Sequence, residues 1–153
     1  MKYQKLGTTN ISVSEFALGC WPFAGGDLWG YQDDSDSIDA VNTSIENGIN
    51  FFDTAPGYGE GKSERVLGKA LEKKRSKVVI ATKVSPNSLD KKGLIKSCEE
   101  SLTRLRTDYV DLYQIHWPNP NIRIEETVEA LIKLKKMGKI RSVSYTHLRA
   151  HET

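Results

Sequence analysis

A regular alternation of short apolar runs with longer amphipathic runs constrains this sequence more than any other feature. The apolar runs occupy residues 16–21, 50–54, 78–84, 110–116 and 140–143, and each is short enough for a buried strand. Successive runs begin about 30 residues apart, which is the length of one strand–helix unit. Strict alternation of this kind predicts a parallel sheet with helices packed outside it.

The segments between these runs carry hydrophobic residues at helical spacing. Ile38, Val41 and Ile45 fall on one face of the first such segment, and Ser35 or Asp36 is expected to cap the start of that helix. Similar stripes lie within residues 66–71, 94–105 and 128–134, and the last is followed by two lysines and a glycine, a typical helix ending. We therefore expect a helix between each pair of successive strands.

Two parallel folds share this alternation, a doubly wound sheet and a (β/α)8 barrel. No G-x-G-x-x-G pattern follows the first predicted strand, which weakens the dinucleotide-binding doubly wound interpretation. Residues 1–15 alternate around a Gly-Thr-Thr-Asn turn, and they predict a β-hairpin that covers the amino-terminal end of the sheet.

Composition argues against several classes of protein. The net charge of +2 is small and the basic residues are mixed with acids, so we expect no nucleic-acid partner. No apolar run approaches the roughly 20 residues that span a bilayer, and no signal peptide is visible, so we expect no membrane association. Two cysteines, Cys20 and Cys98, suit packing roles in a reducing cytoplasm. His147 and His151 have the spacing of a helical metal pair but lack a third ligand, so we expect no metal site.

Four reactive side chains follow the predicted strands. Asp53 ends the second strand and Tyr58 lies in the loop after it, while Lys83 and His116 end the third and fourth strands. Taken singly, each has an ordinary structural role as a cap, a surface tyrosine, a rim charge or a half-buried imidazole. Functional side chains of parallel α/β folds collect at the carboxyl ends of the strands, so we expect these four to converge at one mouth.

Such a group suits the protonation of an oxygen that gains negative charge. A tyrosine hydroxyl ordinarily titrates near pH 10 and donates its proton poorly at neutral pH. An adjacent ammonium favours the tyrosinate form, a carboxylate holds that ammonium in place, and an imidazole can orient a carbonyl oxygen. The chemistry is that of carbonyl reduction, in which a nicotinamide cofactor has to supply the hydride.

Several segments resemble signature sequences of the aldo-keto reductases, in the order and with the spacing of that family. They read GINFFDTAPGYG at 48–59, ATK at 81–83 and DYVDLYQIHWP at 108–118. The opening YQKLGTTNISVSEFALGCW and the segment GYGEGKSERVLGKAL are also similar, nearest the bacterial branch with general stress and aryl-alcohol dehydrogenase-like members. The resemblance covers residues 1–144.

This resemblance implies a fold, a reaction and catalytic roles. The fold would be a (β/α)8 TIM barrel, and the reaction would be reduction of aldehydes or ketones by hydride from NADPH. Tyr58 would be the general acid, Lys83 would make its hydroxyl more acidic, and Asp53 would pair with Lys83. His116 would orient the substrate carbonyl.

The resemblance also implies where substrate and cofactor bind. Trp21 and Trp117 would line the substrate mouth, and Asp53 would also contact the cofactor, whose other ligands in the family lie mainly in the second half of the barrel. A full barrel typically needs about 250 residues, whereas residues 1–144 supply four strand–helix units and a fifth strand. We therefore expect this chain alone to have little or no activity, and we expect its unpaired sheet edges to favour self-association.

The sequence departs from the family pattern near its end. After Ser144 it reads YTHLRAHET instead of continuing a strand of the type I-G-V-S-N-F, and we interpret residues 145–153 as a non-native or disordered tail. Two alternatives to a catalytic fragment stay open: a non-catalytic, NADPH-sensing regulatory module, and a half-barrel completed by a partner chain. The natural substrate and the choice between NADPH and NADH are also left open.

Overall fold

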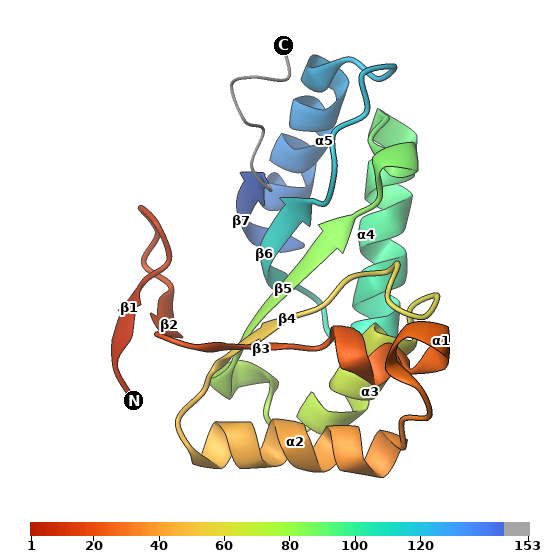
Figure 1. The fold of residues 1–153 in the computed structure, drawn as a ribbon. Coiled ribbons are helices and arrows are strands. Elements are labelled where there is room, and N and C mark those ends of the chain that lie inside the picture. Colours follow the sequence, from red (N-terminus) through yellow and green to blue (C-terminus); the bar gives the residue numbers. More distant parts are fainter. Residues whose placement is uncertain (146–153) are drawn as a thin grey trace, which may run out of the picture.

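The computed structural model describes residues 1–145, which contain a single five-stranded parallel sheet (Figure 1). The strands lie in the order of the chain, so that each pairs with the next. They are β3 (Ala17–Gly19), β4 (Phe51–Asp53), β5 (Val79–Val84), β6 (Val110–Ile115) and β7 (Ile140–Tyr145). The predicted parallel sheet is confirmed.

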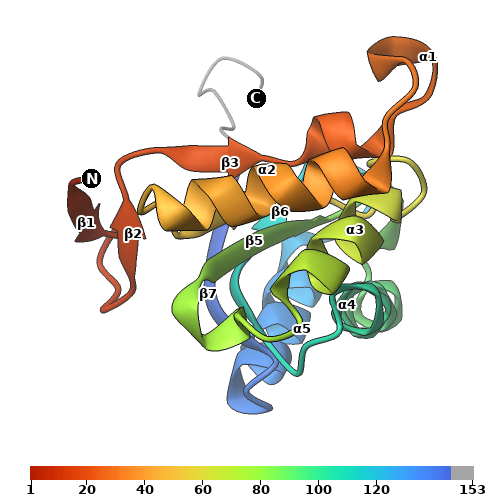
Figure 2. The same cartoon turned by 90° about the horizontal axis from the view of Figure 1, so that it is seen from below.

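Helices follow the strands as the periodicity predicts. The longer ones are α2 (Asp34–Glu46), α3 (Lys62–Leu71), α4 (Lys91–Leu105) and α5 (Ile124–Lys136). Figure 2 shows them following one another along the same side of the twisted sheet. Short helices lie in the loops: η1 (Trp21–Ala24), α1 (Gly26–Trp29), η2 (Arg75–Lys77) and η3 (Pro86–Ser88).

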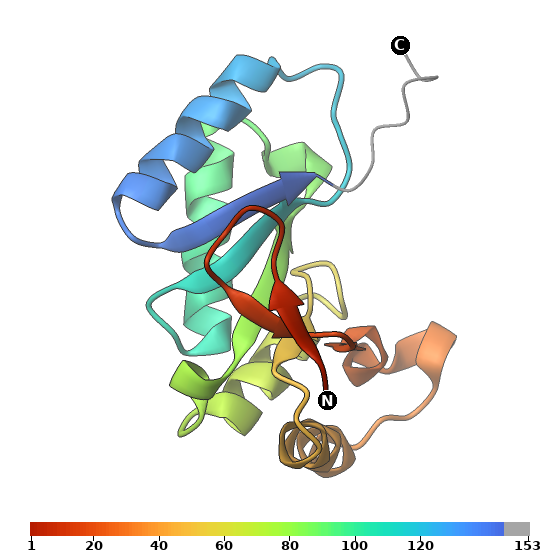
Figure 3. The same ribbon diagram turned by 90° about the vertical axis from the view of Figure 1, so that its left-hand side faces the viewer.

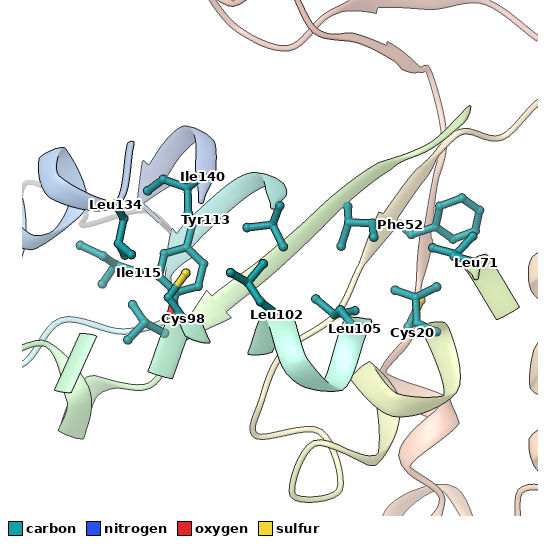
Figure 4. Close-up of a cluster of buried hydrophobic side chains, with 14 of the residues drawn as sticks. Cys20, Phe52, Leu71, Cys98, Leu102, Leu105, Tyr113, Ile115, Leu134 and Ile140 are labelled. Carbon is teal, nitrogen blue, oxygen red and sulfur yellow. The ribbon is translucent and has the colours of Figure 1, made fainter. Parts of the chain in front are cut away.

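The main core lies between the sheet and its helices (Figure 4). Alternation along β6 turns Tyr113 toward the helix layer, where it lies beside Cys98 of α4 and Leu134 of α5. Phe52 of β4 occupies the same layer farther along, near Leu71 of α3. Because this layer takes every second residue of a strand, the residues between them face the opposite side of the sheet.

A β-hairpin lies beside the ends at which the strands begin (Figure 3). Its strands, β1 (Tyr3–Lys5) and β2 (Ser12–Ser14), pair antiparallel. Ile11 and Val13 pack against Val79 at the start of β5, in a second buried cluster that also contacts Phe51 of β4. The hairpin therefore leaves the carboxyl ends of the strands uncovered.

The start of α2 differs from the prediction. Asp33 is the N-cap, and its carboxylate accepts a hydrogen bond of 2.7 Å from the backbone N–H of Ser35. Neither Ser35 nor Asp36 caps the helix, because both lie inside its first turn, whereas Asp33 has the extended backbone that a cap requires. At the other end of the helix layer, Gly138 follows α5 with a φ of 72°, as its predicted role in ending that helix requires.

Strand β7 extends one residue beyond the predicted boundary at 144, because Tyr145 pairs with Ile115 of β6. The rest of the predicted tail, with His147 and His151, lies outside the described residues. Among residues 1–145, no three His, Cys, Asp or Glu side chains gather as metal ligands would. Within the same range, no helix combines the length and apolar character needed to cross a bilayer.

An apolar hollow of about 270 Å³ lies between α5 and β7. Ile132 and Val143 line it and are exposed, although the helical stripe predicts that Ile132 is buried like Leu131. The difference arises because β7 pairs only with β6 among the described residues, so no further unit covers this side of α5.

Candidate active site

The carboxyl ends of three neighbouring strands bring the four predicted catalytic residues together. Asp53 is the last residue of β4, Lys83 lies one residue before the end of β5, and His116 directly follows β6. The N–H of His116 donates to the carbonyl of Val84 at 3.1 Å, which extends the pairing of β5 with β6 to the site. Tyr58 reaches the same place from the loop between β4 and α3.

The Lys83 ammonium is the centre of this group. Its Nζ donates to Asp53 Oδ2 at 2.6 Å, to the carbonyl oxygen of Thr54 at 2.9 Å and to the Tyr58 hydroxyl oxygen at 3.1 Å. Lys83 is only 5% exposed. An ammonium has three protons, so every one has an acceptor, and the adjacent carboxylate balances the buried charge.

The acceptor at Thr54 is itself fixed by a network of hydroxyl groups. Thr54 Oγ1 lies 2.8 Å from Ser63 Oγ, which donates to the carbonyl oxygen of Cys20 at 2.6 Å. All three residues are buried. The start of α3 is thus tied to the ends of β3 and β4, and the carbonyl that receives Lys83 has little freedom to move.

Tyr58 is held with its ring between an indole and an ammonium. The ring stacks on Trp21 with centroids 5.6 Å apart, and Lys83 Nζ lies 4.8 Å from its centroid. The loop reaches this position because Gly59 adopts a φ of 60° and packs so closely that a Cβ would lie 3.0 Å from the Cβ of Ala24. Since the Tyr58 oxygen accepts from Lys83, its own proton is free to be donated elsewhere.

His116 also contacts Tyr58 and is the fourth member of the group. Its ring meets the tyrosine ring edge-on at 6.0 Å and stacks on Trp117 at 6.1 Å. Burial, followed by the charge of Lys83, lowers the pKa of His116 below its ordinary value. The imidazole is therefore neutral at pH 7 and can share a hydrogen bond with a carbonyl oxygen.

Two residues of this region were missed by the sequence analysis. Trp29 of α1 packs edge-on against Trp21 at 5.6 Å and is also exposed, so it extends the aromatic wall formed by Trp21 and Trp117. Gln114 of β6 donates from Nε2 to Asp53 Oδ1 at 2.9 Å. Its position in the sequence could have indicated this role. Gln114 is a polar residue inside an apolar run, and it precedes His116 by two positions, so a strand places both side chains on the same face of the sheet.

A nicotinamide cofactor fits the donor set at this mouth. Tyr58 can donate a proton, but no side chain among the described residues can donate hydride. Asp53 is one third exposed, and each of its oxygens accepts one hydrogen bond from the protein, from Lys83 or from Gln114. A carboxylate oxygen has two lone pairs, so each retains one acceptor position for a hydroxyl group of a bound cofactor.

A profile of the Aldo/keto reductase family matches residues 15–152. The chain belongs to this family. Aldo-keto reductase YhdN of Bacillus subtilis is 40% identical in an alignment 157 positions long that covers 96% of this chain and 47% of the relative. The NADH-specific methylglyoxal reductase of Escherichia coli is 39% identical, with 98% of this chain and 53% of the relative covered. The chain thus spans about half the length of these relatives.

Solved structures of the family match the fold. The thermostable aldo-keto reductase Tm1743, in complex with the inhibitor epalrestat, has a TM-score of 0.91 and 38% identity, covering 98% of this chain and 55% of its own. The aldo-keto reductase of Klebsiella pneumoniae in complex with NADPH has a TM-score of 0.84 and 35% identity, covering 92% of this chain and 48% of its own. The five strands and their helices therefore match about half of the barrel of this family.

Proposed function

We propose that this chain carries the acid–base groups of an NADPH-dependent carbonyl reductase that converts aldehydes or ketones to alcohols. The observation that carries the proposal is the hydrogen bonding of Lys83, whose Nζ contacts Asp53, Thr54 and Tyr58 together. This arrangement places a fixed positive charge against the oxygen of a tyrosine at an exposed mouth, where it stabilises the tyrosinate left after proton transfer.

Each residue then has one task. Tyr58 and His116 hold the carbonyl oxygen, and Tyr58 gives it a proton as that oxygen gains negative charge. Lys83 stabilises the resulting tyrosinate, and Asp53 keeps the Lys83 ammonium in place. NADPH, when bound, supplies the hydride that reduces the carbonyl carbon. The products are an alcohol and NADP⁺, and the tyrosinate regains its proton from solvent.

The substrate is a small carbonyl compound with an apolar or planar part. Trp21 and Trp117 would flank it, and Trp29 would extend the wall on the side of Trp21. Aromatic faces of this kind favour apolar and planar groups. The methylglyoxal reductase among the relatives is named for a small carbonyl substrate.

The preference for NADPH over NADH is part of the proposal. An NADPH complex is known for the related Klebsiella reductase, whereas one relative is described as NADH-specific. In this chain Asp53 would hold part of the cofactor through its remaining acceptor positions. The site would work in the cytoplasm, where the buried and free thiols of Cys20 and Cys98 would stay reduced.

Because the chain spans about half of its relatives, we expect weak turnover or none from residues 1–153 alone. The test therefore joins residues 1–144 to the carboxyl-terminal half of Bacillus subtilis YhdN and follows NADPH oxidation with 4-nitrobenzaldehyde. The chimera should reduce the aldehyde, and Tyr58→Phe should lower kcat by at least about 100-fold because the general acid is lost.

Two results would count against the proposal. If the chimera binds NADPH but reduces no carbonyl compound, a non-catalytic cofactor-sensing module becomes the better description. If Tyr58→Phe retains full activity, Tyr58 is not the acid. Rapid turnover by the 153-residue chain itself would disprove the expectation that it is nearly inactive.

A further inference from the structure

Three polar side chains lie in one row across the sheet at the proposed site. Strand pairing places Lys83 of β5 opposite Gln114 of β6, and Gln114 opposite Ser144 of β7. Paired residues of neighbouring strands project to the same face, so all three side chains lie on the face that carries the site. Asp53, at the end of β4, contacts two members of this row, Lys83 and Gln114.

Both carboxylate oxygens of Asp53 therefore accept a hydrogen bond from this row. Oδ2 accepts from Lys83 Nζ at 2.6 Å, and Oδ1 accepts from Gln114 Nε2 at 2.9 Å. A carboxylate held at one oxygen only can rotate about its terminal torsion, because that torsion is broad. A second donor on the other oxygen fixes the plane of the carboxylate, and with it the position of the Lys83 ammonium.

Ser144 determines which end of the Gln114 amide faces Asp53. Ser144 Oγ lies 3.2 Å from Gln114 Oε1 and donates to it, so the oxygen of the amide points to β7 and its NH₂ points to Asp53. The reverse orientation would place two acceptors, Gln114 Oε1 and Asp53 Oδ1, against each other. The position of β7 therefore affects the orientation of the Asp53 carboxylate, through the hydrogen bonds of Ser144 and Gln114.

We propose that Gln114, oriented by Ser144, is a positioning residue that holds Asp53 in the plane required to direct Lys83 at Tyr58. The importance of Lys83 for catalysis rests on the function proposed above, whereas the positioning itself is a property of the folded chain. Gln114 donates to Asp53, and Asp53 accepts from Lys83, so Gln114 acts on the ammonium through this carboxylate.

The test measures the Lys83 ammonium directly, in the full 153-residue chain and without cofactor. Lysine labelled with ¹⁵N at Nζ gives the exchange rate of the ammonium protons with water, and the Lys83 signal is identified by its loss in Lys83→Met. In Gln114→Leu this exchange should accelerate about tenfold, the equivalent of one lost hydrogen bond to a charged group. Gln4→Leu, a change of the same type on the exposed β1, should leave it unaltered.

Two further variants separate positioning from simple packing. Ser144→Ala should accelerate exchange in the same direction by about threefold, since it frees the Gln114 amide without removing it. Gln114→Glu keeps the size of the side chain but sets a carboxylate against Asp53. Relative to the parent chain at the same pH, its exchange should be accelerated at pH 7, because a carboxylate cannot donate to Asp53, and the difference should narrow at acidic pH, where a protonated Glu donates to Asp53. Measuring the parent chain at each pH controls for the acid dependence of the exchange itself and for titration of His116 at the same mouth.

The possible outcomes distinguish this inference from the proposed function. Unchanged Lys83 exchange in Gln114→Leu and Ser144→Ala would overturn it, even if the chimera with YhdN reduces aldehydes. Faster exchange in both variants would support it, even if the chimera proves inactive and the proposed function fails. If Gln114→Leu does not fold, Ser144→Ala decides, because its small change leaves the packing of β6 intact.

Discussion

The imidazole of His116 is half-buried and lies close enough to the Lys83 ammonium to be affected by its charge, and this environment links its protonation to stability. Burial first, and then Lys83, lowers its pKa in the folded chain below the value of about 6.5 expected in the unfolded chain. Between these two values the unfolded chain binds more protons, so the stabilising contribution is complete above about pH 6.5 and is lost as the pH falls through the folded value.

We therefore predict that His116→Asn reduces the acid sensitivity of folding. Urea unfolding at roughly pH 5 and pH 7.5 gives the loss of stability for each protein, and the loss should be smaller in the variant because its side chain does not titrate. The carboxylates titrate in both proteins, so they cancel in the comparison. Equal losses in the two proteins would mean that His116 has no depressed pKa.

The two cysteines are predicted to be inert in the folded chain. Burial raises the pKa of Cys98 to about 12, with a smaller contribution from Glu99, and burial also raises the pKa of Cys20. Because the thiolate is the reactive form, neither residue should react with a disulfide reagent at pH 8. Titration with 5,5′-dithiobis(2-nitrobenzoate) should find no reactive thiol before denaturation and two after it. A fast-reacting thiol in the native chain would contradict the burial of these residues.

At the scale of elements, a buried carboxylate joins four parts of the fold near the start of the strands. Asp111 of β6 is fully buried and accepts from Arg75 of η2 at 2.8 Å, from Arg141 of β7 at 2.7 Å and from the N–H of Ile80 in β5 at 3.0 Å. Its removal would leave the buried N–H of Ile80 without its acceptor and the largely buried Arg75 without its counter-ion, and such losses are costly.

We predict that Asp111→Ala lowers the free energy of unfolding by about 3 kcal/mol. Glu129→Ala provides the control, because Glu129 forms an ion pair of 3.0 Å with Lys91 in which both side chains are exposed, and it should cost less than about 1 kcal/mol. Both values come from urea unfolding followed by circular dichroism. Similar effects of the two substitutions would show that the Asp111 contacts contribute little.

The elements themselves were largely predictable, and the failures have physical causes. Strands such as β5 and β6 follow from apolar runs that must be buried on both faces, and that pattern is visible in one sequence. The cap of α2 was misplaced because Asp33, Ser35 and Asp36 are all good caps, and only the backbone conformation decides among them. Trp29 and Gln114 were missed because their importance lies in contacts with Trp21 and Asp53, which are distant in sequence.

The convergence of the four catalytic candidates was predictable for a different reason. Asp53, Lys83 and His116 each follow an apolar run, and parallel strands place the ends of such runs side by side. Tyr58 was expected at the same mouth because its loop directly follows the strand that ends at Asp53. The direction of each hydrogen bond, such as the donation from Lys83 to Tyr58, required coordinates.

At the scale of the whole molecule, the described sheet has an edge at β3 and another at β7. Beside β7, the exposed side chains of Ile132 and Val143 border the apolar hollow. Edges with apolar neighbours pair readily with other chains, so we predict that the chain self-associates as its concentration rises.

Sedimentation velocity over a range of concentrations should detect this association, and Val143→Lys should weaken it because a lysine on an edge strand opposes pairing. Leu28→Lys changes another exposed apolar residue, on α1 and outside the hollow, and should have no effect. A chain that stays monomeric throughout, or an equal response to the two substitutions, would argue against the β7 edge as the interface.

The consecutive order of the strands also bears on how the site forms during protein synthesis. Because β3 to β7 each pair with the next strand in the chain, the sheet can grow by one strand–helix unit at a time, in the order of synthesis. The hydrogen bonds of Lys83 to Asp53 and Tyr58 join residues of two successive units, whereas Ser144, which orients Gln114, belongs to the last described strand. Lys83, Asp53 and Tyr58 can therefore come together while the ribosome is still translating, and the synthesis of β7 then adds the Ser144 hydroxyl that orients Gln114.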